Sequence, residues 1–245
     1  MPKKNNQMAF LPSVEQIILT MSNHIRVLTV LFNTVISNKE IPLFRGAVLH
    51  ALGEQANLLY HNHTGEHTFR YAYPLIQYKR VQGKAAIVCI EEAIDTLVQL
   101  LKEVSGPIKL GRRDTECEVV HIYSSKEQIQ INDHFTSYRL LQWLPLNSNN
   151  YSEYQQTDGI LQKVQLLEHV LTGNILSFLK GVDIYIEEQL EVRITDILEQ
   201  SPATYKGVPL MAFGIEFKTN LSIPQNIGLG KSVSVGYGTL TKITH

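Results

Sequence analysis

Apolar residues in the first half of the chain follow strand-like and helix-like periods in turn. Residues 25–35 (IRVLTVLFNTV) are rich in β-branched and aromatic side chains, which is typical of a buried strand. Residues 43–54 place apolar side chains at helical spacing, which predicts a helix. Residues 73–81 and 84–90 alternate on either side of the turn Gln82-Gly83, which predicts a hairpin.

The next two segments complete a recognisable order of elements. Residues 91–103 begin with acidic side chains and carry one apolar face, as expected of an amphipathic helix. Residues 117–123 (CEVVHIY) read as a last strand. The order strand, helix, strand, strand, helix, strand is that of a ferredoxin-like module, which we expect to end near residue 130.

The second half of the chain shows a similar succession of strand and helix patterns. It predicts a strand, a polar loop, a helix and three further strands, at residues 135–144, 146–158, 159–179, 191–197, 208–219 and 234–243. We therefore predict an α+β protein of two tandem ferredoxin-like domains, at residues 21–130 and 131–245. Residues 1–20 pair with nothing obvious, and we treat them as an N-terminal extension.

Composition sets limits on function. The 245 residues carry 22 Lys plus Arg against 23 Asp plus Glu, so a nucleic acid would have to bind at a local patch rather than to a global basic field. Cys89 and Cys117 have no CxxC spacing, which favours a reducing, cytoplasmic setting. Apolar runs such as 27–32 fall short of the roughly 20 residues that span a bilayer, so we expect neither a membrane segment nor a secretory signal.

Residues 227–240 (IGLGKSVSVGYGTL) form the most distinctive segment of the chain. Its glycines are Gly228, Gly230, Gly236 and Gly238, and they surround Lys231 and Ser232. Glycine allows positive φ and close approach to a ligand, and free N–H groups beside a lysine can bind an anion such as a phosphate backbone. The spacing of a Walker loop is absent, which disfavours ATP. The alternative is a β turn whose glycines serve packing alone.

This segment resembles the glycine-rich loop of the CRISPR-associated repeat-processing endoribonucleases, which belong to the repeat-associated RNA-binding superfamily. Residues 41–54, 58–63, 73–90 and 171–181 are similar to the b-type branch of these enzymes. The resemblance implies tandem ferredoxin-like folds, binding of CRISPR repeat RNA, one metal-independent cut per repeat and a 2',3'-cyclic phosphate product. It implies no cofactor. A non-catalytic RNA-binding subunit of a CRISPR complex is the alternative.

Attack of a ribose 2'-OH on the adjacent phosphate needs a base, an acid and a cation. His50 lies on the first predicted helix, where the family tends to place its catalytic histidine, so the resemblance makes it our candidate general base. His61 and His63 follow in a histidine-rich connection and could share the acid or base role. His50 could instead be a structural histidine. No metal site is predicted, because His63 and His67 lack further ligands, and a zinc-dependent nuclease is the alternative that a chelator tests.

Other polar residues offer weaker candidates for RNA contact. Arg45 begins the first helix and could meet a phosphate. Local basic patches lie at Lys79, Arg80 and Lys84 and at Lys109, Arg112 and Arg113, and stacking tyrosines are candidates at Tyr71, Tyr73, Tyr78 and Tyr237. The partners implied are the CRISPR repeat RNA and other CRISPR effector subunits, with a homodimer left open.

Overall fold

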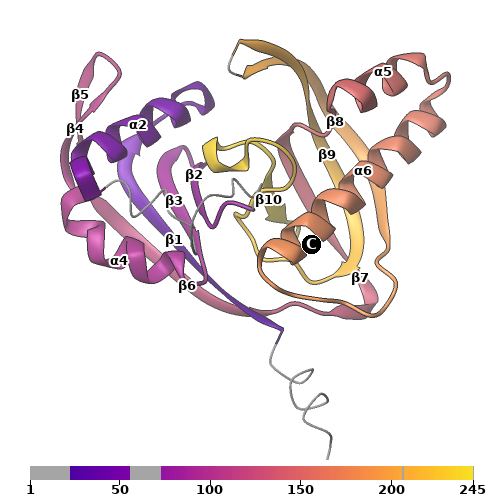
Figure 1. Ribbon diagram of the computed structural model, residues 1–245, viewed down its shortest axis with the longest axis horizontal. Helices are drawn as coiled ribbons and strands as arrows, with labels where there is room; N and C mark the ends of the chain where they lie inside the picture. The colour runs from indigo at the N-terminus through magenta and orange to yellow at the C-terminus, as the bar shows by residue number, and fades with distance from the viewer. Residues whose placement is uncertain (1–22, 56–72, 206, 245) are drawn as a thin grey trace, which may run out of the picture.

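Two four-stranded sheets, one from each half of the chain, form the framework of the protein (Figure 1). The computed structural model describes residues 23–55, 73–205 and 207–244. The strand orders are β2-β3-β1-β6 and β10-β7-β9-β8, and every named pair within them is antiparallel. In both sheets the first strand of the module lies between the third and the last. This is the ferredoxin-like order twice over, so the predicted tandem fold is confirmed.

The first sheet and its helices match the predicted elements closely. The strands are β1 (His24–Val35), β2 (Ile76–Val81), β3 (Lys84–Ile90) and β6 (Val119–Gln128), and the helices are α2 (Ile41–Leu52) and α4 (Ala93–Val104). Short 3-10 turns, η1 (Asn38–Glu40) and η2 (Gly53–Gln55), flank α2. Phe44 of α2 packs its ring against Phe32 and Tyr78, at 5.5 and 6.0 Å between centroids, which fixes the helix on the sheet.

A hairpin that the sequence pattern did not predict stands between α4 and β6. It consists of β4 (Gly106–Leu110) and β5 (Arg113–Cys117), so the strand predicted to begin at Cys117 begins at Val119 instead. The basic residues predicted there lie around the hairpin tip. One of them, Arg113, forms a 3.1 Å ion pair with Glu40 and so links the hairpin to the start of α2.

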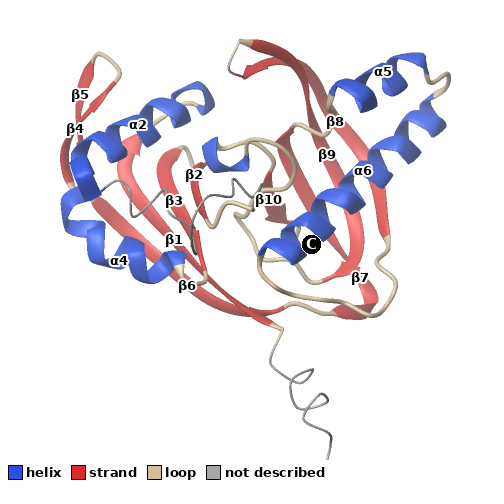
Figure 2. Ribbon diagram, viewed as in Figure 1, coloured by secondary structure: helices blue, strands red, loops and turns tan. Residues whose placement is uncertain are grey.

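The second sheet is crossed by one long helix. Its strands are β7 (Ile131–Trp143), β8 (Val192–Tyr205), β9 (Val208–Leu221) and β10 (Thr239–Lys242), and α6 (Ile160–Gly181) lies across them (Figure 2). The indole N–H of Trp143 donates to Asn174 Oδ1 at 2.9 Å, which ties the sheet to that helix. None of the helices in the described ranges is long and apolar enough to cross a membrane.

The polar stretch predicted as a loop at 146–158 contains a helix, α5 (Ser148–Gln156), so that prediction was wrong. Asn147 caps this helix, because its side-chain oxygen accepts the N–H of Asn150 at 2.8 Å. Tyr154 packs its ring against Phe213 at 5.7 Å. A cap and one buried aromatic therefore stabilise a helix whose composition alone favours a loop.

The second module departs from its own pattern where a second helix would stand. Between β9 and β10 the chain forms only the 3-10 turn η3 (Val233–Val235), so the strand predicted at 234–243 is correct only for its end. Ser232 and Gly236 flank this turn in the left-handed conformation, with φ of 58° and 94°. These two left-handed residues change the direction of the backbone, so the segment cannot continue as an extended strand.

Candidate functional site

The glycine-rich loop (residues 227–238) is packed into the protein rather than held out from it. A Cβ on Gly238 would overlap the carbonyl oxygen of Leu229, and one on Gly236 would overlap Ile41 at the start of α2. A Cβ on Gly230 would lie 2.8 Å from the indole of Trp143. The glycines are therefore needed for close packing within the second module and against the first.

Many backbone amides of this loop are already hydrogen-bonded. The N–H of Leu229 donates to Gly238 O, that of Gly238 donates to Gln142 O, and that of Lys231 donates to Leu144 O, at 2.9, 3.0 and 3.4 Å. The expected row of free N–H groups is therefore not present at these positions. The side chains of the loop, more than its backbone, remain for contact with a ligand.

Polar side chains of the first module form hydrogen bonds that anchor the glycine-rich loop. The hydroxyl of Tyr73 donates to Gly228 O at 2.7 Å, and Gln77 Nε2 donates to the Tyr73 oxygen at 2.9 Å. Tyr73 also packs its ring on Phe178 of α6, at 5.2 Å between centroids. Burial raises the pKa of the Tyr73 phenol, so it stays a hydrogen-bond donor. This tyrosine joins the first module to both the loop and the long helix.

Lys79 has no exposed surface, so the predicted basic patch does not include it. Its ammonium donates to Tyr237 O at 3.4 Å, and a Cβ on Gly228 would lie 2.7 Å from its Nζ. Burial lowers the pKa of Lys79 from 10.5 to about 7. The neighbouring Arg80 is exposed and donates to Ile36 O at 2.7 Å.

Lys231 is the exposed cation of the loop. Its Nζ donates to Leu146 O at 3.3 Å, which places the ammonium beside the segment that follows β7. Partial burial lowers the pKa of Lys231 from its ordinary value. The next residue, Ser232, is half-buried in a left-handed conformation. A phosphate that approached the loop from solvent would meet Lys231 first.

His50 lies in the last turn of α2 and its side chain is exposed. A buried structural role for His50 is therefore excluded, while a structural histidine on the helix surface stays an alternative. The start of α2, at Ile41, contacts the glycine-rich loop. His50 is nine positions after Ile41, which is about 13.5 Å along the helix axis. The same helix therefore carries His50 near its end and the loop-contacting Ile41 at its start.

The remaining predicted residues fall in three places. Arg45 is half-buried on α2 and takes part in further interactions. Tyr78 is a core residue. Tyr71, His61, His63 and His67 lie outside the described residues. Within the described ranges, no group of three or more His, Cys, Asp or Glu side chains is placed to hold a metal ion.

Sequence reasoning missed the buried polar contacts beneath the loop. The signal was present in YPLIQYKRV, where Gln77 and Lys79 occupy alternate positions on a strand with few other polar side chains. Such a pattern normally predicts a solvent-facing side of an edge strand. Here the glycine-rich loop covers that side, and β2 and η3 are in contact.

Comparison with known proteins matches both modules. The family model of the Cas6b N-terminal domain matches residues 23–128, and that of the Cas6b C-terminal domain matches residues 130–243. A crystal structure of Cas6b is similar with a TM-score of 0.81 and 26% identity, and the match covers 90% of this chain and 100% of that one. A crystal structure of the CRISPR RNA processing endoribonuclease Cas6b matches with a TM-score of 0.69 and 25% identity over the same shares.

One curated protein is also similar to this chain in sequence. An uncharacterized protein of Methanocaldococcus jannaschii is 35% identical over 118 residues, which are 48% of this chain and 79% of that protein. The two domain matches together span nearly the whole described chain, in the order that the two sheets require. The chain belongs to the Cas6b family.

Proposed function

We propose that this protein is a metal-independent endoribonuclease that cuts CRISPR repeat transcripts into guide RNAs. One observation carries the proposal: a neighbour named as a CRISPR RNA processing endoribonuclease matches 90% of this chain and 100% of its own. The exposed histidine on α2 and the lysine on the packed loop supply side chains suited to that reaction. We expect the enzyme to act in the cytoplasm.

The proposed step is internal transesterification. His50 takes the proton of a ribose 2'-OH, and the 2'-oxygen attacks the adjacent phosphorus. The bond from phosphorus to the 5'-oxygen breaks, and that oxygen receives a proton from His61 or His63. The products are a 2',3'-cyclic phosphate and a 5'-hydroxyl. No electron acceptor and no water are consumed in this step.

The glycine-rich loop would position the RNA for this step. Lys231 at its surface would neutralise a phosphate, and Arg45 of α2 would contact the backbone further along. Tyr73 and Lys79 hold the loop from the first module, so the loop is already fixed before RNA binds. A rigid anchor of this kind lowers the entropic cost of orienting the scissile phosphate.

Incubation of the full chain in EDTA with the repeat RNA of its own genome tests the proposal. One copy of the RNA would be unmodified, and others would carry a single 2'-deoxy nucleotide at each candidate position. We expect one cut, blocked by one deoxy substitution, and a cyclic phosphate end detected by mass spectrometry.

Three other outcomes would each overturn part of the proposal. Tight binding without any cut would show a non-catalytic RNA-binding subunit. Activity lost in EDTA and restored by zinc would show a metal-dependent nuclease. Cutting that no deoxy substitution blocks would exclude attack by the 2'-OH. Light scattering with and without RNA would show whether a homodimer forms, and co-purification would detect other CRISPR effector subunits.

A further inference from the structure

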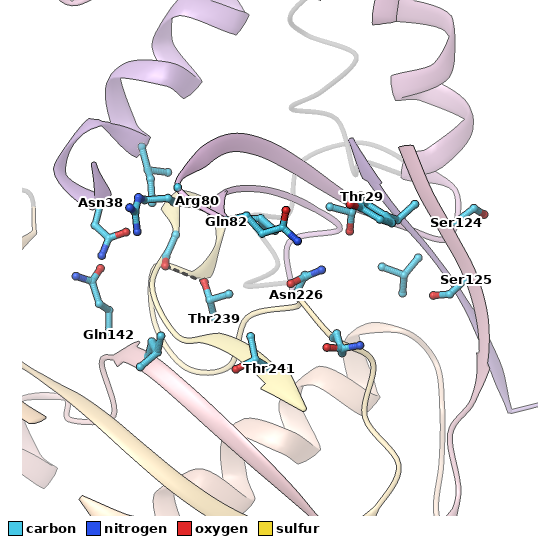
Figure 3. A pocket seen from close by; sticks show the side chains of 18 of the residues that line it. Thr29, Asn38, Arg80, Gln82, Ser124, Ser125, Gln142, Asn226, Thr239 and Thr241 are labelled. Atoms are coloured by element: carbon cyan, nitrogen blue, oxygen red, sulfur yellow. Dashed lines mark hydrogen bonds between the residues drawn. The ribbon is translucent and has the colours of Figure 1, made fainter. Parts of the chain in front are cut away.

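A cavity of about 740 Å³ lies between the two sheets, and His50 is not among the described residues that line it (Figure 3). On the first sheet, Thr29 pairs with Tyr123 and Val27 with Ser125, so these four side chains share one face. All four line the cavity. The opposite wall includes residues of β7 and β10, at Leu141, Thr239 and Thr241. The volume is in the range of small-ligand sites and would hold one or two nucleotides.

Amide side chains from both modules face one another across this cavity. Asn38 of η1 faces Gln142 of β7, and Gln82 of the β2–β3 turn faces Asn226 from the segment before the glycine-rich loop (Figure 3). Each pair therefore spans the two modules. An amide presents a donor and an acceptor side by side, which is the pattern that reads the edge of a nucleobase.

Three of these amides sit on left-handed backbone. Gln82, Gln142 and Asn226 have φ of 51°, 51° and 65°. For a residue with a Cβ this conformation costs roughly 1–2 kcal/mol, and glycine or asparagine usually takes such positions. A glutamine at two of the three sites is therefore not explained by backbone geometry. The amide group itself is the feature that glycine would lack.

The backbone at two of these amides, Gln142 and Asn226, is held by hydrogen bonds within the second module. The carbonyl of Gln142 accepts the N–H of Gly238 at 3.0 Å, and the N–H of Asn226 donates to Leu240 O at 2.9 Å. The register of β7 and β9 is also interrupted between Leu140 and Trp143, where Gln142 lies. Both side chains are therefore directed into the cavity by rigid main chain, as a recognition site requires.

Tyr123, which lines the cavity, forms an exposed aromatic pair with His121. His121 and Tyr123 are two positions apart on β6, so they share a face of the sheet. Their ring centroids lie 4.1 Å apart, and 44% of Tyr123 is exposed. Aromatic side chains on an open sheet face are platforms on which unpaired bases stack.

The charge of the lining argues for bases rather than phosphates. The charged side chains among the described residues that line the cavity are Arg80 and Glu127, which are opposite in sign. A site for phosphate groups would carry a net positive charge. We propose that this cavity binds one or two unpaired nucleotides of RNA, stacked on Tyr123 and read at their base edges by Gln82 and Gln142. This inference rests on the proposed function and gives that function a source of sequence specificity.

Replacement of the amides by glycine tests the proposal without straining the backbone. Gln82→Gly and Gln142→Gly keep the left-handed backbone conformation. Each removes only the side chain whose amide would contact a base. Asp183→Gly is the matched control, because Asp183 is exposed, has φ of 55° and does not line the cavity. The full chain would be titrated by fluorescence anisotropy with its repeat RNA and with copies that each carry one abasic nucleotide.

We expect each glutamine variant to weaken binding on the order of 10-fold, with an unchanged salt dependence and an unchanged cut position. One abasic RNA should bind the wild type as weakly as it binds the variants. Affinities within twofold of the control for both variants, with cutting intact, would overturn this inference and leave the proposed function standing. Absence of binding and cutting by the wild type would overturn both.

Discussion

The ammonium of Lys79 lies 3.4 Å from the carbonyl oxygen of Tyr237, so a buried lysine of the first module ends on the glycine-rich loop of the second. The contact is central to how the two halves meet, because Tyr73 reaches the same loop at Gly228. Lys79 donates to the Tyr237 carbonyl oxygen, and a buried cation held by a neutral acceptor is costly. Burial therefore lowers the pKa of Lys79.

Lys79→Met should stabilise the fold by about 1–3 kcal/mol below pH 7, because it removes a buried charge and keeps most of the volume. The pKa of Lys79 is about 7 in the folded protein against an ordinary 10.5. Between these values the unfolded chain binds a proton that the folded chain does not, so wild-type stability rises with pH across this window. Below pH 7 both states are charged and the penalty is complete.

Urea unfolding from pH 6 to 10 measures this effect. The difference between variant and wild type should shrink as the pH rises. Lys180→Met, at an exposed lysine of α6, is the control and should show no such trend. A constant difference across the range would mean that Lys79 does not titrate there.

Alanine at Gly236 or Gly238 should destabilise the protein by at least about 2–4 kcal/mol, since each adds a Cβ to a left-handed, close-packed position. Gly46→Ala is the matched control. Gly46 lies within α2 and nothing stands within 4 Å of its added Cβ, so alanine there should be neutral or stabilise by up to about 1 kcal/mol. Equal unfolding midpoints for all three variants would contradict the packed loop.

His50→Ala should lower the rate of RNA cutting by about 10²–10⁴-fold if His50 is the general base. Because its side chain is exposed, the free energy of unfolding should change by less than about 0.5 kcal/mol. His134→Ala, at an exposed histidine of β7, should leave the rate unchanged. Single-turnover cleavage at saturating protein separates this loss from weaker binding, and an unaffected rate would remove His50 from the site.

Lys231→Ala should weaken RNA binding and reduce the slope of log affinity against log salt by about 1, as expected for loss of one phosphate contact. Lys180→Ala should leave the slope as it is. Anisotropy titrations from low to high salt provide both quantities. A variant with the wild-type slope would show that the Lys231 ammonium does not touch the RNA backbone.

The ferredoxin-like order of strands and helices could be predicted because apolar residues recur at regular spacing in the buried strands and the amphipathic helices. Residues 25–35 and 160–181 contribute many side chains to the hydrophobic core. Their apolar spacing therefore indicates strand or helix without knowledge of neighbouring segments. The helix at Ser148–Gln156 could not be predicted in this way. It depends on the cap at Asn147 and on Tyr154 reaching Phe213, which is distant in sequence.

Fewer features of the candidate site could be predicted from the sequence. Position on α2 made His50 a candidate and its exposure agrees with that, but its catalytic role stays a prediction. Burial of Lys79 could not be read from alternation, because a period of two defines a face without saying what covers it. The cavity between the sheets gathers residues from segments far apart in the chain, such as Asn38, Tyr123 and Asn226, and no single motif contains them.

The glycine-rich loop stands where a ferredoxin-like module would have its second helix, and this limits how the protein can evolve. Its glycines close the core of the second module, so substitution there is coupled to the survival of the fold. Changes in RNA preference among relatives should therefore accumulate outside these glycines, at cavity-lining side chains such as Gln82 and Gln142. A chimera that received this loop from a relative would also need its matching residues at Ile41, Tyr73 and Lys79.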